Sequence, residues 1–101
     1  MNETIQKQDR IKDLVTAYFN ENAHLYVTDF GLMSNEDRYH IINIGTSIIC
    51  TRMEIGFPGG SFVQSVVDNN LSRAFATADG TNIKALRFYL MMMHNMPITF
   101  N

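Results

Sequence analysis

Hydrophobic residues near the start of the chain recur at the spacing of an amphipathic helix. One stripe at i, i+3, i+4, i+7 and i+8 is formed by Ile11, Leu14, Val15, Tyr18 and Phe19. The pattern predicts a helix from about Thr4 to Asn20, and the polar run Asn20-Glu21-Asn22 predicts its end. From His24 to Met33 the helical period is lost, and we expect a packed connector that turns at Gly31.

A second helix is predicted to begin at Ser34. The serine hydroxyl can cap free amides, and Glu36 and Asp37 suit the first turn because the helix dipole favours acids there. Apolar positions near helical spacing follow at Ile41, Ile42, Ile48, Ile49 and Met53. A β-hairpin around Gly45 is the alternative, since β-branched residues are abundant, but adjacent isoleucine pairs break the alternation of a half-buried strand.

The clearest interruption of the pattern is the run Gly56-Phe57-Pro58-Gly59-Gly60-Ser61. Pro58 fixes its own φ angle, and the glycines allow backbone angles that other residues avoid. Ser61 is predicted to cap a third helix that continues to Ala78. Its broad apolar face is expected to comprise Phe62, Val63, Val66, Val67, Leu71, Ala74, Phe75 and Ala78.

The run Asp79-Gly80-Thr81 predicts the boundary between the third helix and a fourth. Gly80 suits a left-handed helix end, and either Asp79 or Thr81 can begin the next helix. The run His94-Asn95-Met96-Pro97 marks the end of the fourth helix. The predicted buried stripe of this helix is Ile83, Leu86, Leu90 and Met93.

Apolar residues of the fourth helix that lie partly outside this stripe predict a subunit interface, because a helix that is apolar nearly all round is buried on several sides. They are Phe88, Tyr89, Met91 and Met92. We therefore expect an all-α fold, a small bundle of about four helices completed by homo-oligomerisation. Residues 1–101 are predicted to form a single domain, with 1–33 as N-terminal helix and connector and 34–101 as helical core.

Composition and charge exclude several classes of protein. Of the 101 residues, 46% are hydrophobic and 18% are charged, which supports a packed core over disorder. The net charge is -2 and the basic residues are interleaved with acids, so nucleic-acid binding is not expected. The single cysteine, Cys50, is expected to be a buried, unreactive thiol. No apolar run reaches the roughly 20 residues that cross a bilayer and the start is too polar for a signal peptide, so we expect a cytoplasmic protein.

Four short motifs in the second half of the chain carry a resemblance. They are Gly56-Phe57-Pro58-Gly59-Gly60-Ser61-Phe62, Asn69-Asn70-Leu71, Ala78-Asp79-Gly80-Thr81-Asn82 and Asn95-Met96-Pro97. In this order and spacing they resemble a family of small, functionally unassigned proteins of phages and prophages, in which Asp is expected at the position of Asn70. The resemblance covers under half of the chain. It implies a phage context, and it brings no activity or substrate with it.

The glycine-rich turn is the strongest candidate for a binding site. Gly59, Gly60 and Ser61 precede a predicted helix, whose free amides favour anions such as phosphate, and either Phe57 or Phe62 can stack on a base. A tight, capped turn between helices needs the same residues, so both interpretations stay open. Polar residues that suit phosphates or base edges complete the candidate set, with capping as their structural alternative: Arg52, Asn69, Arg73, Asp79 and Asn82.

No set of residues predicts catalysis or a metal site. His24, His40 and His94 lie far apart in the sequence, and no nucleophile elbow surrounds Ser61. We therefore expect no enzyme activity and no cofactor. The leading hypothesis is a non-enzymatic phage accessory protein that counters a host defence by stoichiometric binding, for example an oligomeric sponge for a nucleotide signal. The alternatives are a helical module that inhibits a host protein and a structural phage protein.

Overall fold

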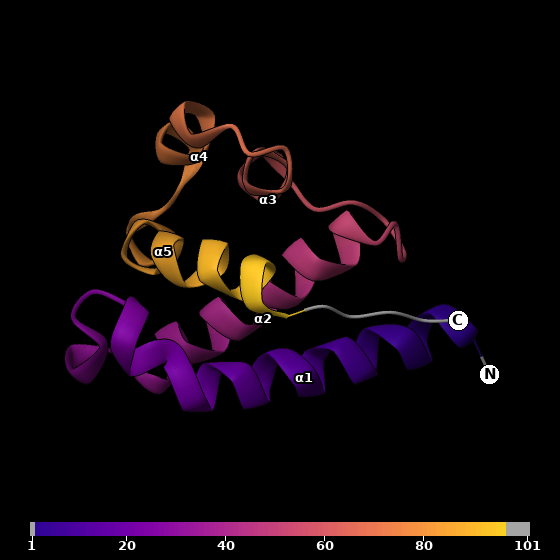
Figure 1. Cartoon of the computed structure of the whole chain (residues 1–101), viewed down its shortest axis with the longest axis horizontal. Helices are drawn as coiled ribbons and strands as arrows, with labels where there is room; N and C mark the ends of the chain where they lie inside the picture. The colour runs from indigo at the N-terminus through magenta and orange to yellow at the C-terminus, as the bar shows by residue number, and fades with distance from the viewer. Residues whose placement is uncertain (1, 97–101) are drawn as a thin grey trace.

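The computed structural model describes residues 2–96, and within that range the chain is all-helical, as predicted (Figure 1). Helices α1 and α2 lie side by side, and α5 packs on both of them. Helices α3 and α4 form a further layer, which α3 joins to α2. The elements in chain order are α1 (Glu3–Tyr26), the 3-10 helix η1 (Phe30–Leu32), α2 (Asn35–Arg52), α3 (Ser61–Val67), α4 (Leu71–Thr77) and α5 (Gly80–Asn95).

The first helix is longer than its sequence pattern predicts. Helix α1 runs to Tyr26, because the polar residues 20–22 lie on or near its outer face and its buried stripe continues past them. This stripe follows i, i+4 spacing, at Ile11, Val15, Phe19 and Ala23. Leu14, predicted to be buried, therefore faces outward and is exposed. The connector between α1 and α2 is correspondingly shorter than the predicted span of residues 24–33.

The second helix begins as predicted, and the alternative hairpin is wrong. The backbone N–H of Asp37 donates to Ser34 Oγ at 3.1 Å, so Ser34 caps α2. Gly45 lies inside this helix and is buried. A Cβ atom at this position would lie 3.1 Å from Val15 Cγ1 and 3.4 Å from Met92 Sδ. Gly45 therefore lets α1, α2 and α5 approach one another closely.

The predicted third helix is divided into α3 and α4, so the chain has five α-helices in residues 2–96 where about four were expected. The backbone turns between them at Asn69, whose φ angle of 59° lies in the left-handed region. Asn70 then caps α4, because its Oδ1 accepts the backbone N–H of Arg73 at 3.1 Å. At the start of α3 the cap position is held by Gly60, and Ser61, the predicted cap, is the first helical residue.

The fourth predicted helix corresponds to α5, and its predicted ends are largely confirmed. Asp79 caps α5 by accepting the backbone N–H of Asn82 at 2.7 Å. Gly80 begins the helix with a negative φ angle, so its predicted role as a left-handed helix end is wrong. The helix ends at Asn95, and Pro97 lies outside the described residues.

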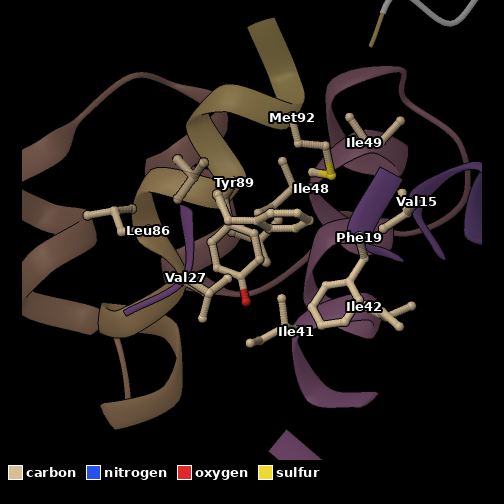
Figure 2. Close-up of a cluster of buried hydrophobic side chains, with 14 of the residues drawn as sticks. Val15, Phe19, Val27, Ile41, Ile42, Ile48, Ile49, Leu86, Tyr89 and Met92 are labelled. Atoms are coloured by element: carbon tan, nitrogen blue, oxygen red, sulfur yellow. The ribbon is translucent and has the colours of Figure 1, made fainter. Parts of the chain in front are cut away.

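The predicted buried stripe of α5 is rotated from the observed one. Phe88, Tyr89 and Met92 are fully buried, whereas Ile83 is exposed. Figure 2 shows Tyr89 and Met92 among side chains of α1 and α2. These residues are covered by the rest of the same chain, because α5 is packed on more than one side, so they do not argue for a subunit interface.

The same core contains the single cysteine. Cys50, on α2, is buried as expected. Burial raises the pKa of its thiol above the ordinary value, because the charged thiolate is poorly solvated there. None of the helices in residues 2–96 combines the length and the apolar character that crossing a bilayer requires.

Candidate functional site

The glycine-rich turn docks the start of α3 on α2. The backbone N–H of Gly59 donates to Thr51 Oγ1 at 2.9 Å, and the carbonyl of Gly59 accepts from Gln64 Nε2 at 2.7 Å. A Cβ atom on Gly59 would lie 2.6 Å from Ser47 Oγ and 2.7 Å from the Cβ of Val63. Close packing of the turn against α2 and α3 therefore explains this glycine without a ligand.

Two residues of the predicted binding set belong to the core. Phe62 is buried, and its ring meets the ring of Tyr89 edge-on at 5.8 Å between centroids. Asn82 is also buried, and its Oδ1 accepts the hydroxyl of Tyr89 at 2.8 Å. Phe62 therefore has no exposed face on which a base can stack, and the carbonyl group of the Asn82 side chain is occupied. Phe57, the other residue predicted to stack, is 97% exposed in the turn. The pairing of Asn82 with Tyr89 had no signal in the sequence.

The remaining residues of the predicted set do not converge on one pocket. Arg52 donates from Nη1 to the carbonyl of Met93 at 2.8 Å, near the end of α5, whereas Asp79 caps the beginning of that helix. A helix of 16 residues is about 24 Å long, so the two side chains are far apart. Asn69 lies in the break before α4, and Arg73 is exposed on α4.

A polar cleft that the sequence did not predict lies between the beginnings of α2 and α5. Thr81 Oγ1 donates to Asp37 Oδ1 at 3.3 Å, and His40 Nε2 lies 3.0 Å from Asp79 Oδ2. Beside them is a cavity of about 480 Å³, whose lining includes Asp29, Asp37, Asp79, Thr81 and Lys84. Lys84 Nζ lies 3.6 Å from Asp29 Oδ2, so each basic group here faces an acid.

The polar side chains of this cleft are paired with one another, through two hydrogen bonds and the Lys84–Asp29 ion pair. A carboxylate beside an imidazole is the arrangement that orients a histidine base in many enzymes. In residues 2–96, however, the hydrogen bonds of His40 reach Asp79 alone, and no group of three or more His, Cys, Asp and Glu residues is placed to hold a metal ion. The His40–Asp79 pair therefore joins α2 to the cap of α5.

The outermost helix, α4, presents apolar side chains to the surface. Leu71 and Phe75 lie one turn apart on α4 and are 45% and 59% exposed. We call these two residues the α4 face. Within the helix only Ala74 is buried, and the main packing partner of α4 is α3 (Figure 1). Because the sequence predicted one continuous third helix, both residues of the α4 face had been expected in the core.

Comparison of the chain with protein-family models, with curated proteins and with solved structures finds no match.

Proposed function

We propose that the chain is a non-enzymatic phage accessory protein that counters a host defence by binding a host protein stoichiometrically through the α4 face. The observation that carries this proposal is the exposure of Leu71 and Phe75 on one side of a short, already folded helix. The resemblance of the motifs between Gly56 and Pro97 to small phage proteins supports the phage context.

The geometry of α4 suits a helix that docks in an apolar groove. Residues at i and i+4 lie on the same side of a helix, and this spacing is typical of helical anchors in protein complexes. Complete burial of a side chain such as Phe or Leu contributes about 1.5–3 kcal/mol. The Asn70 cap and the buried Ala74 already hold α4 in helical form, which lowers the entropy lost on binding.

A nucleotide sponge centred on the glycine-rich turn has less support. Phe57 is exposed, but Phe62 is buried, Gly59 is explained by packing, and Arg52 is engaged with α5. Protein binding therefore replaces nucleotide binding at the turn as our leading proposal.

The test compares two substitutions on α4. Phe75→Ser removes the larger anchor, and Thr77→Ser, on the same helix and also exposed, is the matched control. Both changes are at exposed positions, so we expect changes of at most about 0.5 kcal/mol in the free energy of unfolding. We expect the wild type and Thr77→Ser, expressed in host cells and cross-linked, to yield one complex of fixed stoichiometry. Binding of the purified partner should weaken about tenfold or more in Phe75→Ser, which corresponds to about 1.4 kcal/mol.

Two results would overturn this proposal. The first is a partner that binds Phe75→Ser as tightly as it binds the wild type. The second is self-association of the pure protein that Phe75→Ser weakens, which would assign the α4 face to a second copy of the chain. Native mass spectrometry of the purified protein distinguishes the second result.

A further inference from the structure

A second cavity, unrelated to the α4 face, lies where α1, η1 and α2 meet. Its volume is about 370 Å³, at the lower end of the range of small-molecule pockets. Its apolar part is formed by Phe19, Phe30 and Ile42. Figure 2 labels Phe19 and Ile42. The lining residues that matter for its chemistry are Thr16, Asn20, Phe30, Asn35, Arg38 and Tyr39. We call this cavity the Arg38 pocket.

The guanidinium group of Arg38 is poorly satisfied by the protein. It lies 4.4 Å from the centroid of the Phe30 ring, and its Nη2 donates to the Phe30 carbonyl at 3.3 Å, a long hydrogen bond. Its Nε is buried and has no hydrogen-bond partner. Among residues 2–96, no carboxylate lies within 4.0 Å of this group, although other basic groups in that range, such as Lys7 and Lys84, do face an acid. A half-buried positive charge with five N–H donors is thus held by one weak bond and one ring.

The surroundings of Arg38 add flat rings and amides to this charge. Tyr39 is exposed beside it, and Phe30 lies under it. The side-chain amides of Asn20 and Asn35 are exposed and hydrogen-bond no other described residue. An amide offers both donors and acceptors, which suits the edge of a heterocycle or the oxygens of an acid.

We propose that the Arg38 pocket binds a small planar aromatic anion, with the carboxylate or phosphate group on Arg38 and the ring beside Tyr39. A guanidinium recognises both kinds of oxyanion through paired, charge-assisted hydrogen bonds. A volume of about 370 Å³ admits a single ring system and its acidic group. The site is independent of the α4 face, since neither Leu71 nor Phe75 lines it.

The first experiment titrates the wild-type protein and follows its amide resonances by NMR. The probes are adenosine 5′-monophosphate, phenyl phosphate and benzoate, and the neutral controls are adenosine and benzyl alcohol. We expect saturable shifts at the side-chain amides of Asn20 and Asn35, with at least one anion bound about tenfold more tightly than its neutral counterpart. The tightest probe identifies the source of the anion: a nucleotide, another phosphate ester or a carboxylic acid.

The second experiment changes the charge at the mouth of the pocket and preserves the helix. Asn35→Asp places a carboxylate at the first residue of α2, where the helix dipole favours an acid, so folding should be retained. Asn43→Asp puts the same charge on the same helix outside the Arg38 pocket and is the matched control. We expect Asn35→Asp to weaken binding of the best probe about tenfold or more, and Asn43→Asp to leave it within about twofold.

Three results would overturn the inference. The first is the absence of saturable shifts at probe concentrations of about 10 mM, which is tenfold above a millimolar Kd. The second is equal affinity of the protein for the anions and for their neutral counterparts. The third is equal affinity of the best anion for Asn35→Asp and for the wild type. Because the titration uses the unmodified chain, the first two results do not depend on whether a variant folds. Loss of partner binding in Phe75→Ser has no bearing on any of the three.

Discussion

Two adjacent glycines in the turn before α3 have opposite surroundings. Side-chain atoms of Ser47 and Val63 fill the space where a Cβ atom of Gly59 would lie, whereas nothing lies within 4 Å of the corresponding position at Gly60. Gly60 also has the extended backbone of a helix cap, with a φ angle of -73°. The same substitution at the two positions therefore separates packing from capping.

We expect Gly59→Ser to lower the free energy of unfolding by about 1–3 kcal/mol, because the added atoms overpack the contact between the turn and α2. Gly60→Ser should leave this free energy unchanged or raise it by about 0.3 kcal/mol, because serine can accept a free amide of α3. Urea denaturation measures both. Equal effects at the two glycines would contradict the packing explanation of Gly59.

Tyr89 is the buried group whose ionisation depends most on its surroundings. Burial, and then the negative charge of Asp79, raise its pKa above the ordinary value of 10.0. A tyrosine whose pKa is higher in the folded than in the unfolded state stabilises the fold below pH 10. That stabilisation is lost as the pH rises further, because only the unfolded chain then releases the proton.

We therefore expect the free energy of unfolding to fall between about pH 10 and pH 11, and to fall less steeply in Tyr89→Phe. At pH 7 the variant should be less stable by about 1–3 kcal/mol, since Asn82 Oδ1 loses its buried donor. Chemical denaturation across this pH range measures both effects. The thiol of Cys50 is present in both proteins, so its contribution to the pH dependence cancels in the comparison. Identical pH dependence in the two proteins would contradict the assignment to Tyr89.

At the scale of single residues, the sequence predicted caps better than it predicted contacts. Ser34 was identified, and Asp79 was one of two candidates with Thr81, because a cap bonds amides only three residues away. The cap predicted at Ser61 is wrong by one residue, since Gly60 holds that position. The bond between Asn82 and Tyr89 spans seven residues and depends on which side of α5 is buried. Since the buried stripe of α5 was placed wrongly, Asn82 was interpreted as a binding residue.

At the scale of helices, α4 is held less firmly than the others. It buries one residue, Ala74, and it depends on the hydrogen bond from Arg73 to Asn70 at its start. A helix of seven residues is not stable in isolation, so its cap contributes a large share of its local stability. Local opening of α4 should therefore respond to Asn70 more than the rest of the fold does.

We expect Asn70→Ala to weaken α4 by about 1 kcal/mol, which corresponds to about fivefold faster hydrogen exchange at the amides of Ala74 and Ala78. Exchange in α1 and the buried half of α2 should be unchanged, because α4 packs mainly on α3. Mass spectrometry of exchanged peptides measures this difference. Uniform acceleration along the whole chain would show that α4 does not open separately.

The boundaries of the helices show where periodicity misleads. The break between α3 and α4 was missed because apolar residues keep nearly helical spacing across it, from Val67 to Leu71 and Ala74. The signal was Asn69, since asparagine adopts the left-handed conformation more readily than most residues. The end of α1 was placed too early because a polar run on the outer face of a helix resembles a loop.

At the scale of the whole molecule, the chain is as compact as a single domain of its length. Its radius of gyration is 12.9 Å, close to the value of about 13 Å expected for 100 residues. Of the four α5 residues from which the sequence suggested a subunit interface, Phe88, Tyr89 and Met92 are buried inside this fold, and Met91 is half-buried. The two surfaces that we propose for binding, the α4 face and the Arg38 pocket, lie on different helices.

Neither surface could be found from the sequence. The α4 face depends on a helix break that the apolar pattern conceals. The Arg38 pocket joins residues from Thr16 to Ile42, which meet only when η1 turns the chain back. In the sequence, Arg38 follows Glu36 and Asp37 and resembles an ordinary charged helix start, and only the fold shows that neither acid pairs with it.

The burial of Cys50, the single thiol of the chain, makes the unmodified protein its own reporter of opening. The thiolate is the nucleophile that attacks an electrophilic thiol reagent, and it forms readily only when the core around α2 is exposed to water. The labelling rate therefore measures how often the native fold opens. Any molecule that binds the closed form lowers that rate. Compounds for the Arg38 pocket and proteins for the α4 face can thus be screened in one assay, without a mutation or an attached dye.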